Sequence, residues 1–375
     1  MIKNSSHIFY LLRQSLGTSS EKIDLSALNN ADWVKLVDIA FEGGVAALAV
    51  DGLQRGFAHD NDDDNDNKEG SELVLDSPEL EDLKYEWFGS VFQAEEDYGN
   101  KLNQASRFAS ALAEKGVKCR VLKGMSFAQY YSVPEHRECG DCDVYLGEGW
   151  AVGNEVAVSI GGRYEFGTYK HSHLFFDELM IENHRYLTSF NGTKQGKKIE
   201  RLMEQAIEED DCKYIDESSL VCPNDYFNAL FLLRHDQGDF ISGGLTLRMI
   251  YDWAALLKCC GRKLDWKRLY ADLDECRLRE FARLMTSLCV EYLGTEICPG
   301  MELCDDKALV DEVMEDTIAG GIHAKGVETF GKKCIRIARR FARIWHYRSL
   351  ATESVPRMIW NNFAFSSYMK RKIEM

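Results

Sequence analysis

Apolar residues recur at helical spacing in two parts of the chain, which predicts two helical regions. Over residues 1 to 56, positions such as Trp33 and Leu36 lie on one apolar side. A longer helix is predicted to begin at Pro78, because proline is tolerated in the first turn of a helix, and to run to Lys115. From about residue 195 onward the pattern is helical again. Both ends of the chain are therefore predicted to be helical.

The segment between these regions has a pattern that predicts strands. Short apolar or alternating runs recur there, separated by glycines and turn residues. The predicted strands cover residues 117–123, 142–146, 164–166, 172–176 and 179–184, with short helices over 125–132 and 151–159. The chain is therefore predicted to be α+β, with a small mixed β-sheet core flanked by N- and C-terminal helical lobes.

These patterns divide the chain into four predicted parts. They are an N-terminal helical lobe over 1–116 with an acidic loop at 57–76, a core over 117–190, a C-terminal helical lobe over 191–330, and a basic helical tail over 331–375. The acidic loop lacks the Gly and Glu spacing of a calcium-binding loop, so it is interpreted as solvated.

The C-terminal end is basic. From Lys325 to Met375, twelve Lys and Arg oppose three Glu, a formal charge of +9. The first interpretation is a docking helix with a solvated basic face. The alternative is a surface for RNA, a phosphate-rich substrate or anionic lipid.

The residues most suited to catalysis or metal binding lie where a predicted strand begins with Asp-x-Asp. Asp141 and Asp143 share one face of that strand, since successive strand residues point to opposite faces. Adjacent carboxylates repel each other unless a cation lies between them. Glu182 is the candidate third carboxylate, if its strand is a sheet neighbour; the alternative is a surface carboxylate on an edge strand. The pattern predicts a Mg²⁺ site for phosphate chemistry.

A glycine turn precedes this site by one short helix. Gly124 follows the first strand, and a backbone without a Cβ can approach a phosphate and donate N–H groups to it. Lys123 could add a charge and Ser126 a hydroxyl, while Arg137 could present its planar guanidinium to a triphosphate oxygen. These residues predict that nucleotide phosphates lie beside the Asp pair.

Three segments together resemble a known superfamily: Leu122-Lys123-Gly124, Arg137-x-x-Gly140-Asp141-x-Asp143 and Glu182-x-His184. They resemble nucleotidyltransferases with the polymerase-beta-like fold, and more narrowly a bacterial family of uncharacterised nucleotidyltransferases. The resemblance covers most of the chain, from the Asp32-Trp33 helix to the helix with Leu247-Arg248 and Asp252.

The resemblance implies roles for individual residues. Asp141 and Asp143 would bind two Mg²⁺ ions, with Mn²⁺ as an alternative, and Glu182 would complete the site. The turn with Gly124 and Ser126 would hold the nucleotide phosphates. The implied reaction moves a nucleoside monophosphate from NTP to an acceptor hydroxyl and releases pyrophosphate. Asp143→Asn is expected to abolish transfer and leave the fold intact, because it removes a repelling charge.

His235, Arg248 and Asp252 fall on predicted C-terminal helices. Arg248 and Asp252 are spaced i,i+4, for which a modest surface or interdomain ion pair is the default. The resemblance implies instead that these helices face a cleft, with Arg248 near phosphate or base. His173, His184, His235 and Asp252 are candidates to line the cleft or contact the acceptor.

Other functions use the same residues. His171 and His173 share a strand face and, with His184 and His136, could hold the metal of a phosphohydrolase, but the glycine turn then has no role. A second alternative is a catalytically inactive nucleotidyltransferase-like module that serves in binding or regulation. The presence of all three carboxylates opposes it. Cys139-x-x-Cys142 lacks the second ligand pair of a structural zinc site.

The composition of the chain limits which binding partners and which cellular compartment are expected. The net charge of -16 opposes a protein that coats nucleic acid with its whole surface. Twelve cysteines without regular spacing indicate reduced thiols. No apolar run approaches the roughly 20 residues of a membrane span, and no signal peptide is recognised. We therefore expect a cytoplasmic enzyme that uses NTP and a hydroxyl acceptor, with a small molecule or sugar favoured over a protein or RNA.

Overall fold

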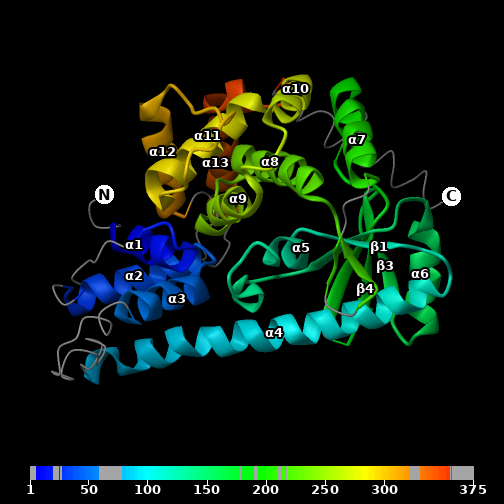
Figure 1. The fold of residues 1–375 in the computed structure, drawn as a ribbon, viewed down its shortest axis with the longest axis horizontal. Coiled ribbons are helices and arrows are strands. Elements are labelled where there is room, and N and C mark those ends of the chain that lie inside the picture. The colour runs from blue at the N-terminus through cyan, green and yellow to red at the C-terminus, as the bar shows by residue number, and fades with distance from the viewer. Residues whose placement is uncertain are drawn as a thin grey trace.

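A seven-stranded mixed sheet lies at one end of the molecule, and helices make up most of the rest (Figure 1). The computed structural model describes residues 6–19, 25, 28–58, 78–177, 179–189, 193–209, 213–215, 218–320, 330–354 and 356. The predicted acidic loop beyond residue 58 and the last part of the basic tail lie outside the described residues. The predicted α+β class with helical flanks is confirmed.

The sheet has the order β3-β4-β5-β2-β1-β7-β6. The central strand β2 runs parallel to its neighbour β5 and antiparallel to its other neighbour, β1. The hairpin of β4 and β5 turns at Asp177, whose φ is 51°. The strands are β1 (Cys119–Leu122), β2 (Cys142–Tyr145), β3 (Arg163–Phe166), β4 (His171–Phe176), β5 (Leu179–His184), β6 (Lys213–Tyr214) and β7 (Leu220–Cys222). All five predicted strands are present, each within two residues of its predicted bounds.

The prediction that the chain is only helical after residue 195 was wrong at β6 and β7. β7 pairs in parallel with β1, and β6 pairs with β7, so the hairpin extends the sheet. Only three residues of β7 take part, and Pro223 follows them. A run this short carries too little periodicity to be separated from the helices on either side.

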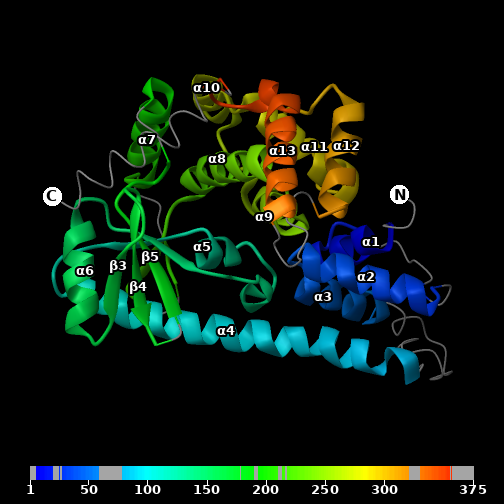
Figure 2. The ribbon, with the colours of Figure 1, turned by 180° about the vertical axis from the view of Figure 1, so that it is seen from behind.

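The long helix α4 (Glu81–Ala113) joins the two ends of the molecule. It runs beneath the N-terminal helices at one end and beneath the sheet at the other (Figure 1 and Figure 2). Trp87 packs into the core of the N-terminal helices, and Phe108 and Leu112 pack against the sheet. The helix begins after a 3₁₀ turn, η2 (Pro78–Leu80), three residues later than predicted.

The N-terminal helices share one hydrophobic core with the C-terminal helices. Leu11 and Trp33 belong to the same cluster as Phe240 and Leu284. The N-terminal helices are α1 (Ser6–Leu16), α2 (Asn30–Glu42) and α3 (Ala46–Ala58). The C-terminal helices are α7 (Lys194–Ile207), α8 (Asp225–Ser242), α9 (Leu247–Cys260), α10 (Trp266–Cys276), α11 (Arg279–Leu293), α12 (Lys307–Ile318) and α13 (Phe330–His346). The boundaries predicted for the four parts of the chain stay a prediction.

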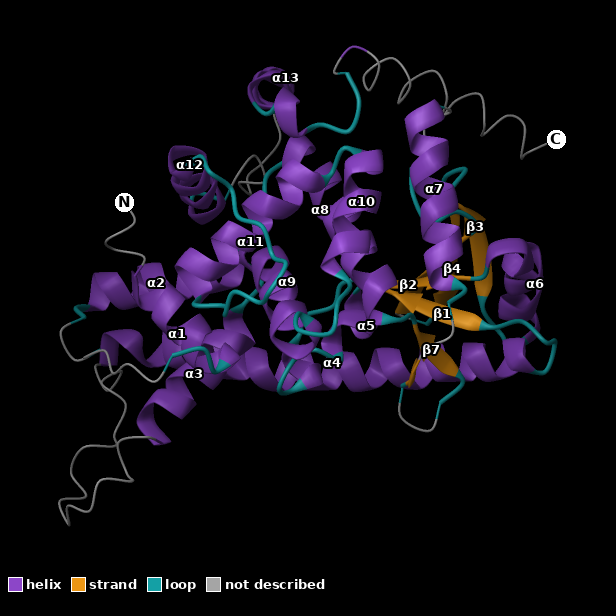
Figure 3. Cartoon of the chain, turned by 45° about the horizontal axis from the view of Figure 1, so that its top comes forward, coloured by secondary structure: helices purple, strands orange, loops and turns teal. Residues whose placement is uncertain are grey.

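Short helices lie in the connections between the strands of the sheet. They are α5 (Gly124–Ala128), η3 (Pro134–His136), η4 (Gly147–Gly149) and α6 (Trp150–Ser159). The orange strands in Figure 3 gather beside α6 and α7 at one end of the molecule. None of the described helices has the length and apolar character that crossing a bilayer needs.

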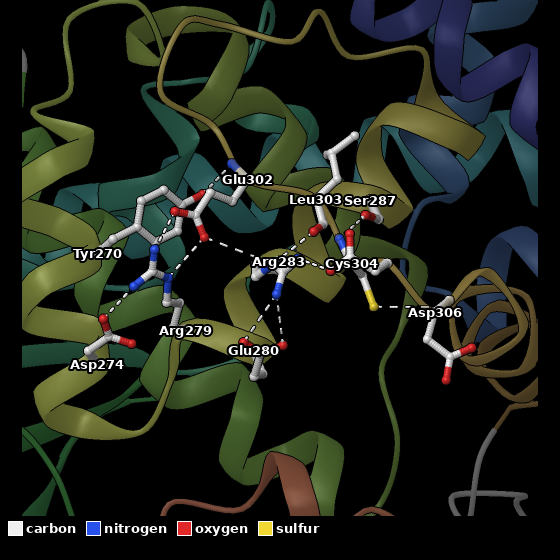
Figure 4. Close-up of polar contacts among 11 residues, drawn as sticks. Tyr270, Asp274, Arg279, Glu280, Arg283, Ser287, Glu302, Leu303, Cys304 and Asp306 are labelled. Carbon is white, nitrogen blue, oxygen red and sulfur yellow. Dashed lines mark hydrogen bonds and ion pairs between the residues drawn. The ribbon is translucent and has the colours of Figure 1, made fainter.

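Polar contacts fix the segment between α11 and α12 onto α11 (Figure 4). Arg283 Nε donates to the Leu303 carbonyl oxygen at 2.7 Å. The Cys304 amide donates to Ser287 Oγ at 2.8 Å. A segment without regular structure satisfies its backbone groups through side chains in this way.

Candidate active site

The carboxylate site forms where β2 and β5 lie side by side. Asp143 of β2 is paired in register with Glu182 of β5, so the two side chains lie on the same face of the sheet. The expectation that these strands are neighbours is confirmed. Asp141 lies one residue before β2. One carboxylate oxygen from each of the three residues lies within 4.8 Å of the other two.

The turn after β1 reaches this site from the other side of β2. Lys123 has φ 43° and ψ -141°, a region that costs a non-glycine residue roughly 1–3 kcal/mol. Its Nζ lies 3.1 Å from Asp143 Oδ1. A Cβ added to Gly124 would lie 3.6 Å from the Asp141 carbonyl oxygen, so the turn lies against the start of β2. A strained lysine beside a buried carboxylate is a feature of functional sites.

The two aspartates have different electrostatic surroundings. Asp143 is 2% exposed; burial alone would raise its pKa, but Lys123 and His184 hold the pKa well below the usual range. Burial, and then the charge of Asp143, raises the pKa of Asp141. Burial also opposes ionisation of Glu182, but the hydrogen bond from His184 is among the contacts that lower its pKa. Asp143 is therefore compensated by protein cations, whereas Asp141 is repelled by its neighbour.

Three histidines surround Glu182. His184 is fully buried, and its Nε2 lies 2.8 Å from Asp143 Oδ1 and 3.2 Å from Glu182 Oε2. Its Nδ1 lies 3.3 Å from the Tyr186 carbonyl oxygen. His171 Nδ1 and His173 Nε2 lie 3.1 and 3.7 Å from Glu182. Burial, and then His184, lowers the pKa of His171 to about 4.

Cationic residues that the sequence analysis missed lie on the same side. Burial and the charge of Lys123 lower the pKa of Lys170 to about 8, while Asp143 opposes this shift. On α8, burial lowers the pKa of Arg234, whose Nε is buried and has no hydrogen-bond partner among the described residues. His235, a cleft candidate of the sequence analysis, responds to the same charges: burial, and then Lys123 and Lys170, lowers its pKa well below the usual range. No spacing in the sequence connects Lys170 or Arg234 to the Asp pair.

Ser126 lies on α5, beside the glycine turn, but its side chain is buried. Its hydroxyl lies 3.3 Å from Asn228 Oδ1 of α8 and donates to that oxygen. The first amides of α5 have no acceptor within the helix, as in any helix N-terminus. The Ser126 hydroxyl therefore already has a protein partner, and its predicted phosphate contact, like that of the turn, stays a prediction.

Arg137 forms a buried ion pair with Asp252 of α9. Its Nε and Nη2 donate to the two oxygens of Asp252 at 2.8 and 2.7 Å, and Tyr131 donates to the same carboxylate at 2.7 Å. The default of a modest surface or interdomain pair between Arg248 and Asp252 was wrong: Asp252 is 3% exposed, and Arg248 donates to the Glu138 carbonyl oxygen. These contacts tie the loop before β2 to α9, and the proposed phosphate contacts of Arg137 and Arg248 stay predictions.

The donor atoms of the site fit a hard divalent cation. Three carboxylates converge from β2 and β5, and oxygen ligands are those that Mg²⁺ prefers. A second group of His171, Glu182 and His184 offers nitrogen and oxygen donors, which suit a transition metal. Among the described residues neither group includes a cysteine, so Cys139 and Cys142 lie outside both.

Comparison with known proteins assigns the chain to a family. Neither the curated proteins nor the solved structures contain a match to it. Residues 29–294 match the model of a family described as uncharacterised nucleotidyltransferase. This match spans well over half of the chain and includes the glycine turn, all three carboxylates and Asp252. The chain therefore belongs to this family of nucleotidyltransferases.

Proposed function

We propose that the protein transfers a nucleoside monophosphate from NTP to an acceptor hydroxyl. The observation that carries the proposal is the convergence of Asp141, Asp143 and Glu182 on one sheet face, beside the turn at Lys123 and Gly124. Family membership supports the same general reaction.

Asp141, Asp143 and Glu182 would hold Mg²⁺ in this proposal, with two ions as the working number. Bound Mg²⁺ supplies electrostatic stabilisation of the charge on the transferring phosphoryl group. The protein itself also stabilises this negative charge. The Lys123 ammonium and the backbone N–H groups after it bind phosphate oxygens.

The proposed reaction balances as a substitution at phosphorus. The acceptor oxygen forms a bond to the α-phosphorus, the bond between the α-phosphorus and the bridging oxygen breaks, and pyrophosphate leaves with the electron pair. The hydroxyl proton passes to Glu182 and then to solvent. The lowered pKa of Glu182 keeps its carboxylate ionised at neutral pH, as a proton acceptor must be, but it also makes this carboxylate a weak base.

Substitution of Asp141 tests the proposed metal site more directly than substitution of Asp143. The expectation that Asp143→Asn leaves the fold intact is revised, because Asp143 is the partner of buried Lys123 and His184. Asp141→Asn removes the carboxylate whose pKa is raised, so we expect a protein at least as stable as wild type that has lost Mg²⁺-dependent NTP binding. Calorimetric titration with each of the four NTPs, with and without Mg²⁺, measures this binding.

Glu165→Gln on β3 is the matched control, because Glu165 is exposed on the same sheet. It should bind NTP as wild type does. Equal NTP binding by wild type and Asp141→Asn would refute the assignment of the site. If wild type binds NTP but transfers no label to any acceptor, the inactive module becomes the better description.

A metal-dependent phosphohydrolase is the second candidate function, favoured by the His171, Glu182 and His184 group. It predicts hydrolysis of p-nitrophenyl phosphate with Mn²⁺ or Zn²⁺ and loss of that activity in His171→Gln. Under the transferase proposal, wild type does not hydrolyse this substrate.

A further inference from the structure

A second polar and aromatic site lies at the far end of β2. It is a cavity of about 430 Å³, within the range of small-molecule pockets. It is bounded by the end of β2, the start of α6, the loop after β5 and α7. Its walls are formed by Tyr145, Glu148, Trp150, Arg185, Tyr186 and Glu204, with Gly147 and Ala151. We call it the Tyr145 pocket.

The Tyr145 pocket is within one small molecule's length of the carboxylates. Tyr145 follows Asp143 by two residues, so both side chains lie on the same face of β2. Two strand residues span about 6.7 Å. On the neighbouring strand, His184 connects the two places: its Nε2 contacts Asp143, and its Nδ1 contacts the carbonyl oxygen of Tyr186 in the pocket wall.

The in-line geometry of the proposed reaction indicates which of the two substrates, NTP or acceptor, binds in this pocket. The attacking and leaving oxygens of phosphoryl transfer lie roughly in line, on opposite sides of the phosphorus. The turn at Lys123 and Gly124, proposed to hold the leaving phosphates, lies against Asp141 at the start of β2. The acceptor must then approach from the end of β2, where the Tyr145 pocket lies.

The pocket walls select against an anionic acceptor. Two carboxylates, Glu148 and Glu204, oppose one guanidinium, that of Arg185. Burial raises the pKa of Glu204, while the charge of Arg201 opposes this shift. The Glu204 carboxylate accepts no hydrogen bond from the described residues. A ligand with hydroxyl or ammonium donors would satisfy that carboxylate, whereas a phosphate would be repelled by it.

The aromatic walls favour a ring with a positive group. The Arg185 guanidinium already lies over Trp150 and Tyr186, at 5.7 and 5.4 Å from their ring centres. Aromatic faces attract cations and pack against flat apolar surfaces. The indole N–H of Trp150 is buried and has no acceptor among the described residues.

We propose that the Tyr145 pocket binds the acceptor, and that the acceptor is an amine-bearing sugar or a similar ring polyol rather than a nucleic acid end. This inference rests on the proposed function. One ring hydroxyl forms the new bond to the α-phosphorus and displaces pyrophosphate, while the ring takes the place of the Arg185 guanidinium on Trp150 and the amine pairs with Glu204.

The test uses the full chain, Mg²⁺, α-labelled NTP and four acceptor probes: glucosamine, glucose, glucose 6-phosphate and a short RNA with a free 3′-hydroxyl. We expect label on glucosamine in preference to glucose, and none on the two anionic probes. Glu204→Gln removes a charge-assisted hydrogen bond, so the KM for glucosamine should rise about tenfold or more. Trp150→Ala should act in the same direction. NTP binding should be unchanged in both variants.

Glu155→Gln is the matched control, since Glu155 is exposed on α6 outside the pocket. The outcomes separate the two proposals. If the wild-type protein does not bind NTP, both the proposed function and this inference are overturned. With NTP binding intact, the inference alone is overturned if RNA or glucose 6-phosphate is labelled preferentially, or if Glu204→Gln and Trp150→Ala leave the KM unchanged. If NTP binds and no probe is labelled, the inference is overturned and the inactive module becomes the better description.

Discussion

At the residue scale, the buried pair of Arg137 and Asp252 predicts a large cost for removing one partner. Asp252 accepts hydrogen bonds from two nitrogens of Arg137 and from Tyr131, and all three residues are buried. Asp252→Asn leaves the buried guanidinium without a counter-charge, so we expect the free energy of unfolding to fall by about 3–5 kcal/mol. Urea denaturation measures the difference.

Two further variants make this prediction specific. Glu296→Gln removes one partner of an exposed pair with Arg262 and should leave the free energy of unfolding close to that of wild type. Replacing both buried partners, as Arg137→Met with Asp252→Leu, should recover much of the lost stability, because no charge then remains buried. A loss in Asp252→Asn no larger than that in Glu296→Gln would contradict the importance of the pair.

At the element scale, the contact of α1 with α3 depends on a glycine. A Cβ added at Gly52 in α3 would overlap the carbonyl oxygen of Leu11 in α1, and backbone cannot move away as a flexible side chain can. We expect Gly52→Ala to lower the free energy of unfolding by about 1–3 kcal/mol, although alanine favours helix. Thermal and urea unfolding measure this change.

Gly89 in α4 is the matched control for Gly52. Nothing lies within 4 Å of a Cβ added there, and the residue is exposed. Gly89→Ala should therefore raise stability by about 0.5–1 kcal/mol, through helix propensity alone. Equal shifts in the two variants would mean that α1 and α3 separate at no cost.

At the scale of the whole molecule, His136 connects three parts of the chain. It lies on η3, with Nδ1 2.9 Å from Asp51 of α3 and Nε2 3.2 Å from Glu95 of α4. The hydrogen bond with Asp51 raises the pKa of His136 above the ordinary value of 6.5, although burial opposes this. The protonated form is thus favoured by folding, so its stabilisation is full below pH 6.5 and is lost as pH rises through the folded pKa.

The measurement is the free energy of unfolding between pH 6 and pH 9 in wild type and His136→Gln. The decline of stability over this window should be smaller in the variant. His346→Gln removes an exposed histidine on α13 and should keep the wild-type profile. Parallel profiles for wild type and His136→Gln would show that His136 does not link its protonation to folding.

The sequence by itself determined most of the elements and brought forward the three candidate carboxylates. Period-two alternation placed Asp141 with Asp143 and Glu182 with His184 on strand faces, and those strands are neighbours in the sheet. Strand runs bounded by glycines were recognisable because each signal is local. The family resemblance agreed with the later family match, since the motifs in the glycine turn, β2 and β5 are contiguous in sequence.

Only the tertiary structure decided which distant side chains meet. The partner of Arg137 is 115 residues away, and no periodicity relates it to Asp252. The short strand β7 exists because β1 offers it hydrogen-bond partners, not because three residues favour a strand. Lys170, Arg234 and the Tyr145 pocket likewise depend on how α7, α8 and the sheet pack. Local patterns determine elements, whereas contacts between elements depend on the shapes and charges of surfaces that are brought together only on folding.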